Sequence, residues 1–185
     1  MNRTSHKKLS FEELQKRSHT VESLRKEARL PICVILENIR SLQNVGSIFR
    51  TADGLRIEEL ILTGYTGKPP RPEIDKTALG AVESVPWRDF EKTEHAINNL
   101  RDKKIKVYAV EQTENSIEFQ KFVFSFPCAV ILGNEFEGIE QETLNVCDGS
   151  IHIPMLGIKQ SLNVSTAFGV IGYEMYRQIE ENGAE

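Results

Sequence analysis

The sequence of 185 residues predicts an α/β fold in which a parallel sheet is flanked by helices. Short apolar runs of strand length alternate along the chain with segments whose apolar residues recur at helical spacing. Several of the runs end in Gly, Asn or Ser, as in open α/β sheets, where ligands bind at the ends of strands. The composition, 39% hydrophobic and 27% charged, is that of an ordinary globular domain.

The individual elements follow from these patterns in chain order. Residues 1–30, with Phe11 and Leu14 and then Val21, Leu24 and Ala28 at helical spacing, predict a helical N-terminal extension ahead of one domain over residues 31–185. The expected strands are Ile32–Leu36, Leu60–Thr63, Lys106–Val110, Ala129–Leu132 and Ser150–Ile153. The expected helices are 44–54, 91–100, 141–145 and a C-terminal helix from about Ser161. Residues 64–76, rich in Gly and Pro, are expected to form a long loop.

The charge of the chain is unevenly distributed. The net charge is −4, yet residues 1–30 hold eight Lys/Arg against four Asp/Glu. A basic arm ahead of an acidic body is suited to contacting phosphates. It is equally compatible with a solvated helical face, and both interpretations stay open at this point.

The remaining composition favours a protein without a metal, a disulfide or a membrane span. Cys33, Cys128 and Cys147 are an odd number without CxxC spacing, which predicts buried thiols in a reducing compartment. No cluster of further ligands accompanies them, so no metal site is expected. No apolar run approaches about 20 residues, and the polar start is unlike a signal peptide, so a cytoplasmic protein is expected.

The first of three polar strand-to-helix junctions contains Asn44, Gly46 and Arg50. Asn44 is placed to cap the following helix or to hold a ligand. Gly46 would allow a backbone or a substrate to approach closely. A capped helix with a surface arginine is the plainer interpretation of this stretch.

The other two junctions follow later strands. Leu132-Gly133-Asn134-Glu135, with Gly138 close behind, predicts a tight turn with exposed backbone N–H groups. It matches neither the GxGxxG of dinucleotide-binding proteins nor a P-loop. The last junction leads from Ile153-Pro154-Met155 to Ser161-Leu162-Asn163, where the polar residues are suited to capping or to ligand binding. No motif couples a histidine to Ser161, which disfavours a serine hydrolase.

Taken together, the junctions resemble the motifs of the SpoU (TrmH-type) branch of the SPOUT RNA methyltransferases. The pattern is Asn44-x-Gly46-x3-Arg50, then Leu132-Gly133-x-Glu135-x2-Gly138, then Ile153-Pro154-Met155 leading to Ser161-Leu162-Asn163. The resemblance covers roughly residues 32–180. It implies an S-adenosylmethionine-dependent enzyme that methylates a ribose 2′-hydroxyl of RNA, with tRNA favoured over rRNA, and it implies a homodimer. It also implies that the C-terminal chain threads through a loop to form a deep trefoil knot.

The same resemblance assigns roles to individual residues. The cofactor would be held around Leu132, Gly133, Ile153, Met155, Ser161 and Leu162. The catalytic set would be Arg50, supported by Asn44, Glu135, Ser161 and Asn163. Arg50 is expected either to bind an RNA phosphate and stabilise the developing alkoxide, or to act as the base. Lys68, Arg71 and Lys76 in the long loop are expected to contact RNA phosphates.

Two other functions remain open on the sequence alone. One is methylation of a base instead of a ribose, which related knotted folds perform. The other is a non-catalytic RNA-binding factor that retains the fold, since a fold by itself does not establish activity.

Overall fold

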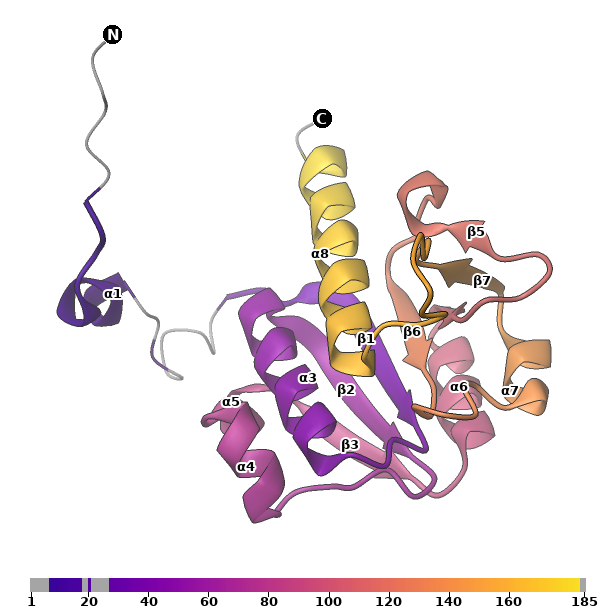
Figure 1. Cartoon of the computed structure of the whole chain (residues 1–185), viewed down its shortest axis with the longest axis horizontal. Helices are drawn as coiled ribbons and strands as arrows, with labels where there is room; N and C mark the ends of the chain where they lie inside the picture. The colour runs from indigo at the N-terminus through magenta and orange to yellow at the C-terminus, as the bar shows by residue number, and fades with distance from the viewer. Residues whose placement is uncertain (1–6, 18–19, 21–26, 184–185) are drawn as a thin grey trace, which may run out of the picture.

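A computed structural model of the chain describes residues 7–17, 20 and 27–183. Its centre is a sheet of seven parallel strands in the order β3-β2-β1-β6-β4-β7-β5 (Figure 1). The predicted class, a parallel α/β sheet flanked by helices, is therefore confirmed. Within the described ranges, no helix has both the length and the apolar character needed to cross a membrane.

The elements have the following bounds. The strands are β1 (Leu30–Glu37), β2 (Ile57–Thr63), β3 (Trp87–Phe90), β4 (Lys106–Val110), β5 (Ile117–Glu118), β6 (Cys128–Leu132) and β7 (Gly149–His152). The helices are α1 (Phe11–Arg17), α3 (Leu42–Leu55), α4 (Pro72–Ala78), α5 (Ala81–Ser84), α6 (Thr93–Asp102), α7 (Gln141–Val146) and α8 (Val164–Asn182), with a short 3₁₀ turn at Phe119–Lys121.

Alternate residues of the central strands enter two separate cores, one on each face of the sheet. Ile32, Val34 and Leu36 of β1 pack with α3 and α8, while Cys33 and Ile35 pack with α6. Both sets are buried, which explains why β1 is an uninterrupted apolar run. Figure 1 shows α3 and α8 side by side over the same part of the sheet, in agreement with their direct packing.

The chain reverses its direction of winding between β1 and β6, which are neighbours in the middle of the sheet. From β1 it continues into α3 on one face, whereas from β6 it continues into α7, whose side chains join the core of the other face. The two connections therefore diverge at the carboxyl ends of these strands. Such a switch point is where open α/β sheets bind ligands.

Several predicted boundaries were wrong in instructive ways. The expected loop over residues 64–76 is a loop only as far as Arg71, because α4 begins at Pro72, where a missing N–H costs the helix nothing. Ser41, and not Asn44, caps α3, since its hydroxyl accepts the N–H of Asn44 at 3.2 Å. The C-terminal helix begins at Val164 with Asn163 as its cap, so Ser161 lies in the loop before it.

The N-terminal region is only partly described. Ser10 and Glu13 form a reciprocal capping box at the start of α1, with distances of 2.6 and 3.2 Å. Phe11 and Leu14 are 74% and 51% exposed, so the apolar side of α1 is not packed on the domain. The second helical pattern, at Val21, Leu24 and Ala28, falls mainly on residues 21–26, outside the described residues.

Gly46 allows α4 to lie against α3. A methyl group on Gly46 would come within 2.0 Å of the Thr77 hydroxyl oxygen and 2.4 Å of the Ile74 carbonyl oxygen. The Thr77 hydroxyl in turn donates to the Gln43 carbonyl at 3.1 Å, which ties the two helices together. The close approach expected at this glycine is thus made by α4.

We expect Gly46→Ala to lower the free energy of unfolding by about 1–3 kcal/mol, because the added methyl forces α4 away from α3. Urea denaturation at a fixed protein concentration measures the change. Gly54→Ala, in the same helix, is the matched control. Its new methyl meets only the Tyr173 hydroxyl at an ordinary 3.6 Å, so the better helix propensity of alanine should leave stability unchanged or slightly raised. Equal effects of the two substitutions would contradict the packing argument.

Candidate cofactor and catalytic site

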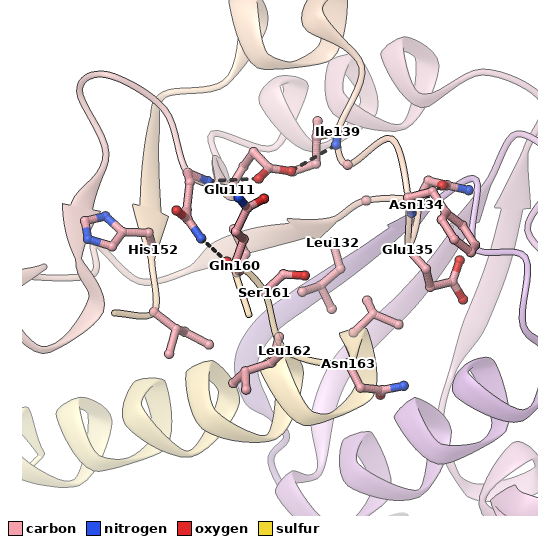
Figure 2. A pocket seen from close by; sticks show the side chains of 18 of the residues that line it. Glu111, Leu132, Asn134, Glu135, Ile139, His152, Gln160, Ser161, Leu162 and Asn163 are labelled. Carbon is pink, nitrogen blue, oxygen red and sulfur yellow. Dashed lines mark hydrogen bonds between the residues drawn. The ribbon is translucent and has the colours of Figure 1, made fainter. Parts of the chain in front are cut away.

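One cavity of about 840 Å³ lies at the carboxyl edge of the sheet, beside the switch point. Its walls come from the residues that follow β4, β6 and β7 and from the loop that precedes α8 (Figure 2). The volume is within the usual range of about 300–1,000 Å³ for small-molecule sites. The cavity is therefore large enough for a nucleoside-sized ligand.

All six residues predicted to hold the cofactor line this one cavity: Leu132, Gly133, Ile153, Met155, Ser161 and Leu162. Figure 2 shows Leu132, Ser161 and Leu162 converging from β6 and from the loop before α8. Four of the six, Leu132, Ile153, Met155 and Leu162, are apolar, although polar atoms make up the larger part of the wall. Among the described residues, the backbone of residues 154–162 forms no hydrogen bond with another backbone group. An adenosine group fits these walls, because a planar base can lie against apolar side chains while free amides and carbonyls bind its edge.

The turn after β6 is built to bring its backbone close to the cavity. Asn134 and Gly138 exchange two backbone hydrogen bonds of 3.0 Å, and the Asn134 side chain accepts the N–H groups of Phe136 and Glu137 at 2.8 and 3.0 Å. A methyl group on Gly133 would come within 2.4 Å of the Gly138 carbonyl carbon and of the Ile139 nitrogen. Gly138 has a positive φ of 72°, which favours glycine. The two glycines are thus required by the folded form of the turn.

Glu135 joins this turn to the start of α3. Its carboxylate accepts the backbone N–H groups of Arg40 and Ser41 at 3.0 and 3.1 Å and the side-chain amide of Asn44 at 2.8 Å. Partial burial raises the pKa of the Glu135 carboxyl, but these donors outweigh it and lower the pKa below its usual value. The group is therefore an anion at neutral pH, a form that the adjacent helix N-terminus also favours.

Asn163 connects the third junction to the same network. Its side-chain amide donates to the Asn44 side-chain oxygen at 3.0 Å, while its own side-chain oxygen caps α8 by accepting the Ser165 N–H at 2.9 Å. Glu135, Asn44 and Asn163 consequently form one hydrogen-bonded chain across the three predicted motifs. Glu135, Ser161 and Asn163 also line the cavity, whereas Asn44 supports them from behind.

Two lining residues, Glu111 and Gln112, were missed by the sequence analysis. Glu111 accepts the Ile139 N–H at 3.2 Å, and Gln112 donates from its side chain to the Gln160 carbonyl (Figure 2). They directly follow β4, which was correctly predicted, so the available signal was a fourth strand end at this edge of the sheet. Glu111 also contacts Gly138, where a methyl group would come within 2.4 Å of its carboxylate.

The other predicted site residues lie outside the cavity. Arg50 is exposed on α3 and, among the described residues, has no hydrogen-bond or ion-pair partner. Lys68 pairs with Asp89, while Arg71 and Lys76 are exposed at the start and in the last turn of α4. These four cations are therefore on the surface of the protein and not in the wall of the cavity.

The three cysteines are unsuited to chemistry in this fold. Burial raises the pKa of each thiol, Cys33, Cys128 and Cys147, to about 12. Cys33 and Cys128 are core residues of adjacent strands, and the Cys147 thiol donates to the Thr143 carbonyl at 3.2 Å. The expectation of buried, small apolar residues is confirmed for Cys33 and Cys128, and Cys147 is half-buried.

The fold and the cavity together define a class of protein. It is an α/β protein with a nucleoside-sized cavity at a switch point of its sheet, and two glycine- and asparagine-rich junctions line this cavity instead of a GxGxxG loop or a P-loop.

Comparison with known proteins narrows this class to a family. The model of the SpoU rRNA Methylase family matches residues 31–173. The tRNA (guanosine(18)-2′-O)-methyltransferase of Thermus thermophilus is 33% identical over 167 residues, which cover 90% of this chain and 85% of that protein. The chain belongs to the SpoU rRNA methylase family, and the resemblance inferred from its motifs is confirmed.

Solved structures agree with this assignment. The A. aeolicus TrmH/SpoU tRNA modifying enzyme superposes with a TM-score of 0.79 at 28% identity, over 92% of this chain and 86% of that one. The SpoU methyltransferase AviRb from Streptomyces viridochromogenes, in complex with the cofactor AdoMet, gives a TM-score of 0.77 at 26% identity, over 85% of this chain and 64% of that one.

We expect Glu135→Gln to lower the free energy of unfolding at neutral pH by about 1–3 kcal/mol, because three N–H donors lose a charged acceptor. The folded-state pKa lies below the unfolded value of about 4.3. The contribution of Glu135 is therefore complete above that value and is lost as the pH falls through the folded-state pKa. Urea denaturation from about pH 7 down to about pH 3 should show the difference from wild type shrinking.

The control for this measurement is Glu137→Gln, two residues along the same turn. The Glu137 carboxylate is exposed and has no hydrogen bond within the described part of the chain. Its replacement should leave the stability nearly unchanged at every pH. If Glu135→Gln lowers the free energy of unfolding by the same amount at every pH, the charge of the carboxylate is not what holds the three donors.

Proposed function

We propose that this protein is an S-adenosylmethionine-dependent RNA methyltransferase that methylates a ribose 2′-hydroxyl, with tRNA as the favoured substrate over rRNA. The observation that carries the proposal is the cavity of about 840 Å³ in which all six predicted cofactor residues meet, in a chain of the SpoU family. Relatives named as tRNA 2′-O-methyltransferases support the choice of reaction and of substrate.

The bound cofactor would supply an electrophilic methyl group on a sulfonium. The ribose 2′-oxygen would form a bond to that methyl as the sulfur–methyl bond breaks, and the hydroxyl proton would leave to a base. The task of this chain is chiefly to align the groups, which can contribute roughly 7–11 kcal/mol in favourable cases. Asn163, Asn44 and Glu135 hold the three junctions in fixed relation, and the anion at Glu135 is placed to favour a cationic ligand in the cavity.

Arg50 is the proposed catalytic arginine. A guanidinium keeps its proton under ordinary conditions, which favours binding of a phosphate and stabilisation of the developing alkoxide over the role of base. In this chain Arg50 is exposed and is not part of the cavity wall. The proposal therefore requires that the RNA, or a second copy of the chain, bring the reacting hydroxyl to it.

We also propose the homodimer that the resemblance implies. Tyr173 and Tyr176 of α8 are 54% and 38% exposed, and an added methyl on Gly54 of α3 would contact the Tyr173 hydroxyl at 3.6 Å. Arg50 lies one turn before Gly54 on the same helix. This aromatic surface beside Arg50 is suited to a second copy, which would place Arg50 at a shared site.

We propose the trefoil knot from the path that the chain follows after β7. β7 lies between β4 and β5, yet α8 packs on α3 beside the other half of the sheet. The segment between β7 and α8 passes the turns after β4 and β6, and Gln112 bonds to it. Passage of this segment through the loop formed by those turns would make the knot. The boundary near residue 30 and the cytoplasmic location remain predictions.

With tritium-labelled S-adenosylmethionine and unmodified tRNA, we expect label on a ribose 2′-oxygen and a loss of turnover of about 100-fold or more in Arg50→Ala. Affinity for the cofactor should stay the same, because Arg50 does not line the cavity. Nuclease digestion and mass spectrometry locate the label, and calorimetry measures cofactor affinity. Arg101→Ala, on α6 on the opposite face of the sheet, is the control.

The outcomes separate the alternatives. Near-wild-type turnover in Arg50→Lys would contradict a role specific to the guanidinium. Label on a base would keep the family and the cofactor but overturn the ribose assignment. Cofactor binding without transfer to tRNA or rRNA would favour a non-catalytic RNA-binding protein.

Replacing Lys68, Arg71 and Lys76 by Gln should weaken RNA binding and flatten its dependence on salt. Each lost phosphate contact reduces the slope of log affinity against log salt by about 0.7–0.9. Filter binding of tRNA at a series of salt concentrations measures the slope.

The matched control replaces Lys103, Lys104 and Lys106, which removes the same charge at the start of β4, the opposite edge of the sheet from the cavity. An equal change of slope in the two triple variants would mean that net charge, and not the position of Lys68, Arg71 and Lys76, sets RNA binding.

A further inference from the structure

The turn that follows β6 presents an aromatic ring to solvent at the mouth of the cavity. Phe136 is 83% exposed and is also one of the residues that line the cavity. Its neighbour Glu135 belongs to the hydrogen-bonded network, but Phe136 takes no part in the core. An exposed phenylalanine at the edge of a binding site indicates a contact with something outside the chain.

The backbone that carries the exposed ring is fixed by hydrogen bonds. The Asn134 side chain accepts the Phe136 N–H at 2.8 Å, and the turn is closed by the backbone pair between Asn134 and Gly138. The backbone of the turn therefore has little conformational freedom left to lose when a partner binds, which favours affinity.

A cation lies over the same ring. The guanidinium carbon of Arg40 is 5.4 Å from the centroid of Phe136. The Arg40 backbone N–H is fixed by the Glu135 carboxylate at 3.0 Å, so the two residues are coupled through the turn itself. An aromatic ring together with an arginine plane is the combination on which proteins stack unpaired bases of RNA.

A second exposed ring is anchored to the same asparagine. Tyr65 is 59% exposed, and its hydroxyl accepts the Asn134 side-chain amide at 2.8 Å. Tyr65 begins the loop that carries Lys68 and Arg71. The second aromatic ring thus belongs to the same loop as two of the proposed phosphate contacts.

We propose that Phe136 and Arg40 form a stacking platform for an unpaired base of the RNA substrate, next to the nucleotide whose ribose is methylated. This deepens the proposed function and rests on RNA being the substrate. Stacking accepts any base, because every base has a π face, so the platform would hold the RNA strand without selecting its sequence. The exposed Glu137 in the same turn repels phosphates, which favours a base over a backbone phosphate at this point.

The test measures binding, so that it does not depend on turnover. A short single-stranded RNA carrying 2-aminopurine is titrated with the protein, and stacking is followed as loss of its fluorescence. For Phe136→Ala we expect the loss of fluorescence to be abolished and the affinity for RNA to fall about 5- to 150-fold. Phe136→Trp should restore both, and Phe136→Leu should restore neither. Because most of the Phe136 side chain is exposed at the mouth of the cavity, the affinity for S-adenosylmethionine, measured by calorimetry, should fall less than the affinity for RNA.

Val123→Ala is the matched control, because Val123 is 80% exposed and does not line the cavity. Unchanged RNA affinity in Phe136→Ala would overturn the proposal. If Phe136→Ala loses affinity for the cofactor alone, the ring stacks on the adenine of the cofactor and the proposal is overturned. If the variant changes its oligomeric state, the ring makes a contact between two copies and the proposal is likewise overturned. Wild-type protein that stacks the RNA base but transfers no methyl would refute the proposed function and leave the platform standing.

Discussion

The site depends on one carboxylate, that of Glu135, and on the three N–H groups that it accepts. These groups come from Arg40, Ser41 and Asn44, which are over 90 residues away in the chain. Without this acceptor, the N–H groups around the start of α3 would face a partly buried region unpaired, which costs more than an ordinary hydrogen bond yields. The same contact fixes the turn after β6, whose backbone forms part of the cavity wall. One anion therefore ties the start of a helix to a turn that lines the cavity.

The polar contacts that join these turns follow from the switch point in the sheet. β1 and β6 are adjacent, but the chain leaves them toward opposite faces, so their carboxyl ends cannot be covered by a single connection. The opening is closed instead by short polar contacts between the turns. Asn44 accepts from Asn163 and donates to Glu135, so it can bridge the third junction to the second. An asparagine suits this place because its side chain has both a donor and an acceptor.

Strands and helices could be predicted from the sequence where their apolar pattern matches their burial in the fold. Contacts between residues far apart in the chain could not. β1 and β4 were recognisable because both faces of the sheet are covered, which makes Ile32–Leu36 and Val107–Val110 continuous apolar runs. β3 was missed because it is a short edge strand, Trp87–Phe90, in which two charged residues stand between two aromatic ones and none of the four is fully buried. The long Gly/Pro loop hid α4, whose first residue is itself a proline.

For the site, the motifs predicted six residues that line one cavity but not the contacts between the three junctions. Spacing along the chain cannot show that Asn44 and Asn163 meet, since 119 positions separate them. Glu111 and Gln112 were overlooked because they lack the glycines and serines that drew attention to the other junctions. Their role comes only from the position of β4 beside β6 and β7 in the sheet.

The place of Arg50 bears on how the reaction could be organised. The chain keeps the cofactor cavity and the proposed catalytic arginine apart, and it leaves Arg50 without a partner among the described residues. An arginine inside the cavity would repel a sulfonium and would need a buried counter-charge, which is costly to provide. An arginine on the surface keeps its hydration until an anionic RNA arrives, and its charge then acts where negative charge develops. With the proposed roles, the separation would let one chain favour a cationic cofactor through Glu135 and an anionic substrate through Arg50.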